Sequence, residues 1–392
     1  MNFLKFKKIK PRYLFLFLIG FLVLVAIELG AILYVNNVYL RENDHYRVTR
    51  INSSSSGSVK HHTLSLPSDA KSISVSHDGN YLAYLENGQI KIADMQSGST
   101  SSVSAEKNRS ISYFKWVYDR DRLTIVEKGS SVSSSSHSQS STDKNGSSRT
   151  SSDSSTSTNT TDYFAELYSY DMSDKTTQLV RDYMNNKDVH IALNSPKDTI
   201  TGMDMSTETV VTYLKITSTT GRSRLWEANV TVQNAALPDL PTHTIGNIQS
   251  LKSTNDLLFE DSDSGQVYQY NATDKDYTPL SINGNTSLRL LGFDQSEKVY
   301  VGIMNGGKVT SIAYGDLSKN NWAFLTPPSA VDPADLSVTY DGKVYYCNAP
   351  ALTMSNRSDN TSTPYSGTVL GSYTNGFYAL KDNTVTDNHF PS

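Results

Sequence analysis

Residues 76–84, which read Ser-His-Asp-Gly-Asn-Tyr-Leu-Ala-Tyr, join a tight turn at Asp78-Gly79 to an alternating strand. Residues 88–94 (GQIKIAD) predict a second strand directly after the first. Weaker copies of this turn–strand–turn–strand unit recur along the chain. The repeat predicts an all-β array of small antiparallel sheets, and arrays of this kind close into β-propellers because radial packing buries their faces and leaves only short edges.

Six copies of the repeat can be aligned along the sequence by their penultimate strand, which often ends at a turn. Those strands are residues 89–93, 166–170, 224–228, 266–270, 310–314 and 376–380. A further strand precedes each of them, at residues 81–84, 123–126, 210–216, 257–260, 299–303 and 344–347. The commonest interval is roughly 40–45 residues, the length of a four-stranded blade. We expect residues 68–392 to form six blades, or seven if strands between Tyr46 and Pro67 form half of another and join the chain ends.

The composition limits the classes of function. Of 392 residues, 10% are aromatic and 19% are charged, with a formal net charge of -4. A nucleic-acid binder normally presents a basic surface, so we expect no nucleic-acid partner. Cys347 is the single cysteine, which excludes an internal disulfide and is typical of an exported bacterial protein, particularly a Gram-positive one. We interpret Cys347 as a small core residue rather than a reactive thiol.

The N-terminus predicts the compartment. Residues 13–35 are almost continuously apolar and are long enough to cross a bilayer as a helix. Residues 1–12 form a basic tail without an acid, so this tail is expected in the cytoplasm and the rest of the chain outside it. A cleaved signal peptide is the alternative, but the run lacks a small-x-small cleavage site at its end. We expect an uncleaved anchor in the plasma membrane that contacts lipid through residues 13–35.

A carboxyl group lies inside the predicted span. Such a group is a functional candidate because it is costly in lipid unless it is protonated, paired or near an interface. Glu28 is that residue, and Ala26 and Gly30 form a small-xxx-small pair that permits close approach of another helix. Two interpretations stay open: association with another membrane helix through these three residues, or an acid solvated near the outer interface.

Two polar segments interrupt the repeats. Residues 36–67 are a polar stalk with candidate closing strands, and residues 129–161 consist almost entirely of Ser, Thr and Asn. The second segment lacks the apolar residues needed to offset the entropy of ordering, so we expect it to be disordered. It is either a passive spacer or an O-glycosylated tract.

Residues 76–84 resemble the WD40-like repeat of TolB and of propellers of the dipeptidyl peptidase IV type, whose consensus is close to S-x-D-G-x-x-L-A-F/Y. Residues 339–345, with the turn Asp341-Gly342, are a shorter match. The resemblance implies a propeller that is a protein-binding platform or a gating domain of a peptidase, and fold alone licenses neither role. The sequence has no Gly-x-Ser-x-Gly elbow of the hydrolase domain that those peptidases carry.

No catalytic, cofactor or metal site is identifiable from spacing. Residues 261–265 (DSDSG) resemble the start of a calcium loop, but a loop of that type needs a Glu at its twelfth position, which is Ala272 here, so a hairpin turn is favoured. His45, His61 and His62 lack partners at typical zinc spacing. We assign the three tryptophans to blade packing rather than to carbohydrate platforms; they are Trp116, Trp226 and Trp322.

These observations favour a non-enzymatic binding scaffold, sensor or assembly factor that is anchored at the bacterial cell envelope. Its partner is expected to be a membrane or cell-wall protein or a cell-wall polymer, and no cofactor is expected. The alternative is a propeller enzyme, a hydrolase or lyase acting on cell-surface glycans or peptides with a site in the central channel. A third hypothesis is a surface glycoprotein that displays the Ser-rich segment.

Overall fold

The computed structural model describes residues 62–135, 158–182, 187–229, 234–348, 353–356 and 361–390, together with Phe21, which is helical. The chain divides into two compact units, residues 1–58 and residues 59–392. The rest of the predicted span 13–35, the basic tail 1–12 and most of the stalk lie outside the described residues. In the part of the chain that is described, no helix has the length and hydrophobicity that crossing a bilayer requires.

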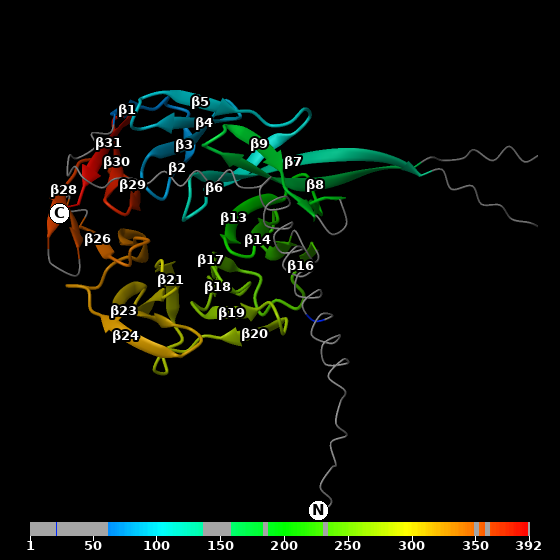
Figure 1. Cartoon of the computed structure of the whole chain (residues 1–392). Coiled ribbons are helices and arrows are strands. Elements are labelled where there is room, and N and C mark those ends of the chain that lie inside the picture. The colour runs from blue at the N-terminus through cyan, green and yellow to red at the C-terminus, as the bar shows by residue number, and fades with distance from the viewer. Residues whose placement is uncertain are drawn as a thin grey trace, which may run out of the picture. The chain divides into compact units, whose positions relative to one another are not determined.

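The second unit is a seven-bladed β-propeller of antiparallel sheets (Figure 1). The strands of blade 1, from the centre outward, are β2 (Lys71–Val75), β3 (Tyr81–Glu86), β4 (Gln89–Asp94) and β5 (Thr100–Val103). Those of blade 2 are β6 (Ser110–Trp116), β7 (Arg122–Ser135), β8 (Thr158–Asp171) and β9 (Thr176–Leu179), and β12 (His190–Leu193) pairs with β8 as well. Those of blade 3 are β13 (Thr199–Ser206), β14 (Val211–Thr217), β15 (Ser223–Asn229) and β16 (Ala235–Ala236). A separate short pair links blades 2 and 3, β10 (Arg181–Asp182) and β11 (Lys187–Asp188).

The other four blades repeat this order. Blade 4 consists of β17 (Ile245–Ser250), β18 (Leu257–Asp261), β19 (Val267–Asn271) and β20 (Asp276–Pro279). Blade 5 consists of β21 (Leu288–Phe293), β22 (Val299–Asn305), β23 (Lys308–Asp316) and β24 (Asn321–Leu325). Blade 6 follows the 3-10 turn Pro333–Asp335 and consists of β25 (Leu336–Val338), β26 (Val344–Asn348), β27 (Thr353–Asn356) and β28 (Ser362–Pro364). Blade 7 consists of β29 (Thr368–Tyr373), β30 (Gly376–Lys381), β31 (Thr384–His389) and the N-terminal strand β1 (Leu64–Ser65).

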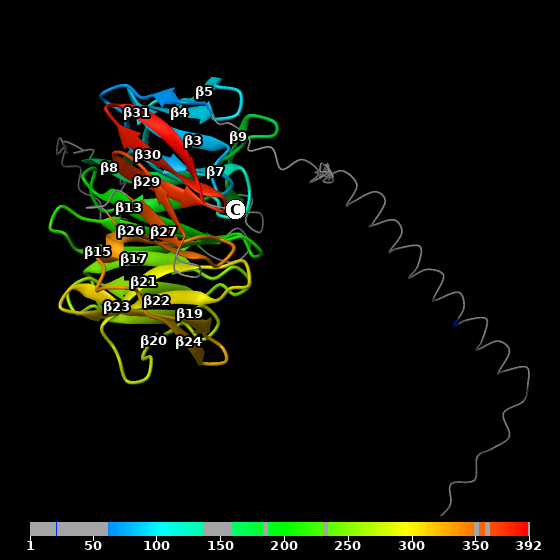
Figure 2. The same ribbon diagram turned by 90° about the vertical axis from the view of Figure 1, so that its left-hand side faces the viewer.

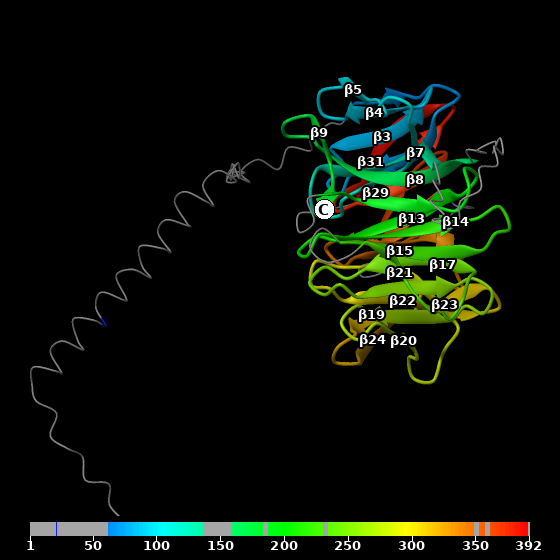
Figure 3. The same cartoon turned by 90° about the vertical axis from the view of Figure 1, so that its right-hand side faces the viewer.

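Strand β1 closes the ring by joining the two ends of the propeller. Leu64 lies opposite Val385 and Ser65 opposite Thr384 in the antiparallel pair β1–β31. The side views show blade 7 next to blade 1 on one side, and blades 2, 3 and 4 following one another on the other side (Figures 2 and 3). An N-terminal strand therefore completes the last blade, as the sequence predicts, but it supplies one short strand rather than half a blade.

The core of the propeller lies between blades, where apolar side chains of neighbouring sheets meet. The described residues form seven hydrophobic clusters, and each cluster combines residues of two adjacent blades. The cluster between blades 7 and 1 includes Tyr378, Val385 and Leu82 in contact with Leu66, which follows β1. Successive side chains of a middle strand point to opposite faces, so such a strand contributes to both interfaces of its blade. The hydrophobic effect thus favours the complete ring over an open array, since an open array would expose two of these faces.

The sixth unit of the sequence alignment merged two blades. Residues 344–347 belong to β26 of blade 6, whereas residues 376–380 belong to β30 of blade 7. In blade 6 the alignment missed β27, whose sequence TMSN carries few of the β-branched and aromatic residues typical of strands. The seventh blade arises from this division, and the N-terminus adds only its outermost strand, β1.

The hairpin β7–β8 extends into the Ser-rich segment. Its pairing continues from Arg122 opposite Asp171 to Ser135 opposite Thr158, and Figure 1 shows it projecting beyond the ring. The predicted disordered segment, residues 129–161, therefore begins and ends within paired strands, because cross-strand hydrogen bonds do not require apolar side chains. Residues 136–157 lie outside the described residues.

Candidate functional site

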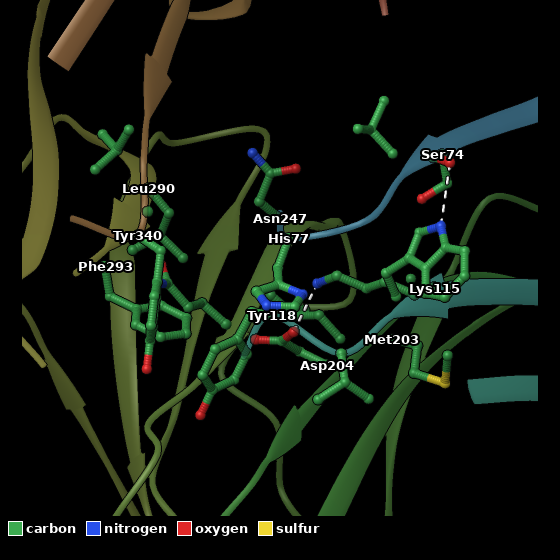
Figure 4. A pocket seen from close by; sticks show the side chains of 18 of the residues that line it. Ser74, His77, Lys115, Tyr118, Met203, Asp204, Asn247, Leu290, Phe293 and Tyr340 are labelled. Atoms are coloured by element: carbon green, nitrogen blue, oxygen red, sulfur yellow. Dashed lines mark hydrogen bonds and ion pairs between the residues drawn. The ribbon is translucent and has the colours of Figure 1, made fainter. Parts of the chain in front are cut away.

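The innermost strands of all seven blades line a central cavity of about 480 Å³ (Figure 4). Six of these seven strands contain a register shift against the second strand of their blade. A β-bulge of this kind bends a strand and redirects its side chains. The cavity is thus lined by side chains from seven separate parts of the sequence. We call this cavity the channel. The turn end of the channel is the end at which each inner strand leads, through a turn, into the second strand of its blade.

Three aromatic rings meet across the turn end. Tyr118, just after β6 of blade 2, contacts Phe293 of blade 5 edge-on, with ring centroids 4.6 Å apart and planes at 88°. Its ring also lies 5.8 Å from that of Tyr340 in blade 6. The hydroxyl groups of Tyr118 and Thr207 of blade 3 share a hydrogen bond of 2.7 Å. These contacts between blades on different sides of the ring narrow the channel here and give it an apolar floor.

An ion pair crosses the wall of the channel. Nζ of Lys115 in β6 donates to Oδ1 of Asp204 in β13 at 2.6 Å, and Oδ2 of Asp204 accepts from the backbone N–H of Ser250 in β17 at 2.7 Å. Asp204 is buried, with 6% of its side chain exposed. Burial on its own would lower the pKa of Lys115, but the adjacent carboxylate outweighs it and raises that pKa. The pair therefore connects blades 2, 3 and 4 while it stays charged.

Two amide side chains on β17 line the same cavity. The side chain of Asn247 points into it (Figure 4). Gln249 is 6% exposed, and no residue that the structure describes accepts a hydrogen bond from its Nε2. Buried polar groups are nearly always hydrogen-bonded, so such a donor at a cavity wall indicates a ligand or an ordered water. The channel wall thus contains, at Gln249, a buried amide donor that no described residue satisfies.

A histidine and several acids meet near the turn end. Nδ1 of His77, in the β2–β3 turn of blade 1, lies 3.4 Å from Oδ1 of Asp121, in the β6–β7 turn of blade 2. Burial on its own would lower the pKa of His77, but Asp121, Asp78 and Asp119 together outweigh it and raise that pKa. His77 lines the channel, whereas Asp121 lines a neighbouring cavity of about 350 Å³. The pair therefore lies between two cavities.

The repeat turns identified in the sequence have closely similar hydrogen bonds. Oδ1 of Asp78 accepts from the hydroxyl of Ser76 at 2.8 Å, and Oδ1 of Asp341 accepts from that of Thr339 at 2.6 Å. The following glycines, Gly79 and Gly342, have φ angles of +79° and +82°, which residues with a Cβ rarely adopt. These turns hold His77 and Tyr340 beside the channel. The predicted membrane-helix contacts lie outside the described residues; they are Ala26, Glu28 and Gly30.

The other motifs have structural positions. Residues 261–265 form the turn between β18 and β19. Burial alone would raise the pKa of Asp261, but hydrogen bonds from Ser264, Thr244, Asp263 and Thr242 lower it to about 2.

The single cysteine and the tryptophans lie in or beside sheets. Cys347, in β26, is half-buried against the hydroxyl of Tyr365 at 2.5 Å, and burial raises the pKa of its thiol. Trp116 and Trp226 are buried between blades, whereas Trp322 lies in the outer strand β24. His45 and His61 lie outside the described residues.

Sequence reasoning missed the residues that make the channel. The contacts of Tyr118 with Phe293 and of Lys115 with Asp204 join different blades, so no local spacing announces them. Position within the repeat is the signal that could have found them. His77, Tyr118 and Tyr340 each lie two residues after the end of an inner strand, namely β2, β6 and β25.

Comparisons with known proteins show a general likeness of fold. No protein-family model matches the chain, and no curated protein sequence matches it. Among solved structures, a chain of the mitotic checkpoint complex has a TM-score of 0.49 and 12% identity, covering 84% of this chain and 91% of that one. Virginiamycin B lyase from Staphylococcus aureus has a TM-score of 0.49 and 11% identity, covering 84% and 99%. YCF48 bound to a D1 peptide has a TM-score of 0.46 and 10% identity, covering 84% and 97%.

These likenesses carry no argument about function, and they assign the chain to no family. The resemblance to TolB and to dipeptidyl peptidase IV stays a resemblance of the repeat. The class that the strand pairing defines is the seven-bladed β-propeller.

Proposed function

We propose that this chain is a binding protein of the bacterial cell envelope, tethered by residues 13–35, whose propeller channel holds part of a membrane protein, a cell-wall protein or a cell-wall polymer. The observation that carries the proposal is the unpartnered amide of Gln249 in the channel wall. Ligand sites combine apolar walls with a few placed polar groups, and the channel has an aromatic floor and the amides of Gln249 and Asn247.

The scaffold suits binding because its recognition groups lie on packed strands. Gln249 is in β17, and Lys115 and Asp204 are in β6 and β13, each held between neighbouring sheets. Side chains on such elements lose little conformational entropy when a ligand arrives, which favours affinity.

Photo-crosslinking from within the channel tests this proposal. A photoreactive amino acid replaces Asn247 in the full chain, expressed in host membranes, and the control carries it at Asn321, which is exposed on the outer strand β24. We expect a discrete crosslinked product from position 247 and none of the same mass from position 321. Equal products, or none from position 247, would contradict a binding role for the channel.

The tether is a separate part of the proposal. Its support is the apolar run at residues 13–35 behind a basic tail. Protease added to intact host cells should digest an epitope at the C-terminus and spare one at the N-terminus. The opposite pattern, or an epitope released into the medium with a shortened chain, would refute the anchor.

An enzyme acting on cell-surface glycans or peptides is the second candidate, and the grouping of His77 with Asp121, Asp78 and Asp119 near the channel favours it. A histidine between carboxylates is a common general acid or base. Turnover of host wall fragments by the wild-type chain and its loss in His77→Gln would support this candidate. Retention of the crosslink from position 247 in that variant would separate binding from catalysis.

A further inference from the structure

The cluster of His77, Asp78 and Asp121 has the composition of a metal site. One ligand atom from each side chain lies within 4.8 Å of the other two. Nδ1 of His77 and Oδ1 of Asp121 are both buried and form an ion pair at 3.4 Å, and neither atom makes a well-aligned hydrogen bond with a described residue. A metal ion coordinated by both atoms would satisfy these two buried polar groups.

The separation of these atoms suits a tetrahedral ion. Zinc binds histidine nitrogen and carboxylate oxygen at about 2.0–2.1 Å, so two ligands of a tetrahedral ion are about 3.3 Å apart. The observed 3.4 Å between His77 and Asp121 is close to this value. An imidazole ligand favours zinc and similar transition metals over calcium or magnesium, which prefer oxygen.

Neighbouring cations are engaged with other acids. Arg120 donates two hydrogen bonds to Asp119, and Arg122 donates two to Asp171. In the part of the chain that the structure describes, Asp121 forms its ion pair with His77. Arg120 and Arg122 thus pair with Asp119 and Asp171, and the carboxylate of Asp121 faces the imidazole of His77, so one metal ion would contact both.

Asp78 has capacity for a further bond. Its Oδ1 accepts from Ser76 and from the backbone N–H of Asn80, and its Oδ2 accepts from the side chain of Asn80. A carboxylate offers about four acceptor positions, so one position on Oδ2 remains. The His77–Asp121 pair also lies between two cavities, because His77 lines the channel and Asp121 lines the neighbouring cavity.

We propose that His77, Asp78 and Asp121 bind one divalent transition-metal ion of the zinc type, held between blades 1 and 2 with one coordination position open toward a cavity. The ligands come from two turns, the β2–β3 turn of blade 1 and the β6–β7 turn of blade 2. The ion would be coordinated by the facing atoms of His77 and Asp121, and its binding would be independent of whether the channel binds a polymer, a protein or neither.

Cobalt titration of the metal-free full chain in detergent tests the proposal. We expect one Co²⁺ per chain with the visible absorption of a four-coordinate nitrogen and oxygen site, displaced by Zn²⁺ and not by Ca²⁺. His77→Gln and Asp121→Asn should each weaken binding by more than about tenfold, since even residues that only support a ligand contribute 10–100-fold. His190→Gln is the matched control, because it removes a histidine that pairs with Glu166 at 3.2 Å and leaves binding unchanged.

A second measurement needs no variant. Bound Zn²⁺ should protect His77, and not His190, from modification by diethyl pyrocarbonate, as mapped by mass spectrometry. The proposal is wrong if the wild-type chain takes up no stoichiometric ion, if His77→Gln and His190→Gln bind equally, or if zinc leaves the modification of His77 unchanged.

Discussion

Alanine substitutions at two turn glycines, Gly79 and Gly88, measure separately the cost of backbone strain and the cost of crowding the contact between blades 1 and 7. Gly79 has a φ of +79°, and a Cβ there would lie 2.8 Å from the ring of Tyr373 in β29. Gly88, in the β3–β4 turn, has a φ of +75° with no atom within 4 Å of such a Cβ. Gly88→Ala should therefore lower the free energy of unfolding by about 1 kcal/mol through backbone strain alone. The positive φ costs a residue with a Cβ about 1–2 kcal/mol, and the less flexible unfolded chain of the variant offsets part of this cost.

Gly79→Ala adds a clash that Tyr373 cannot relieve easily. The ring of Tyr373 is 3% exposed, and its hydroxyl donates to Asp387 at 2.6 Å. Overpacking of this kind costs about 1–3 kcal/mol, so Gly79→Ala should destabilise the propeller by about 2–4 kcal/mol in total. The assay is the shift in the urea unfolding midpoint of the full chain in detergent, followed by tryptophan fluorescence. Equal shifts for the two variants would refute the contact of this turn with blade 7.

Three further predictions follow from the channel and the turns. Lys115→Met removes the ion-pair partner of buried Asp204 and should destabilise the fold by about 2 kcal/mol; an unchanged unfolding midpoint would contradict the pair. Tyr118→Ala removes the contact with Phe293 and should speed amide hydrogen exchange in the inner strands, whereas unchanged exchange would show that the rings do not close the turn end. Asp261 has its pKa lowered to about 2, so its stabilisation is present above the unfolded value of about 4 and is lost as pH falls through about 2. Asp261→Asn should thus lower the midpoint at pH 6 but not near pH 2, and a difference independent of pH would rule this out.

Much of the fold follows from short-range sequence patterns. The Asp-Gly pair at residues 78–79 predicts a tight turn, because glycine readily adopts a positive φ. The alternating strands that follow can bury side chains toward two neighbouring blades, so residues 76–94 predict part of a blade. The interval between such units predicts a propeller. The number of blades was less clear, because β27 and β28 of blade 6 are short and polar, and residues 344–347 were therefore aligned with residues 376–380 of the next blade.

The candidate sites follow from the packing of blades around the ring rather than from local pattern. Tyr118 meets Phe293 because blades 2 and 5, which are distant in sequence, surround one axis, and His77 meets Asp121 because the consecutive blades 1 and 2 share one interface. The sequence marks the turn that holds His77, but it does not show which acid of which blade faces it. Sites of this kind become visible only when the blade order and the register of each inner strand are known.

The channel requires a closed ring, and one disulfide tests the closure directly. Ser65 and Thr384 lie opposite each other in β1 and β31, so their Cα atoms are about 4.5–5.5 Å apart, within the range that a disulfide spans. In a Cys347→Ser background, Ser65→Cys with Thr384→Cys should form an intramolecular disulfide that shifts the mobility of the monomer on a non-reducing gel. Ser65→Cys with Thr386→Cys, two residues out of register, should not. Crosslinking that is absent, only intermolecular, or equal in both pairs would contradict the closed seven-bladed propeller.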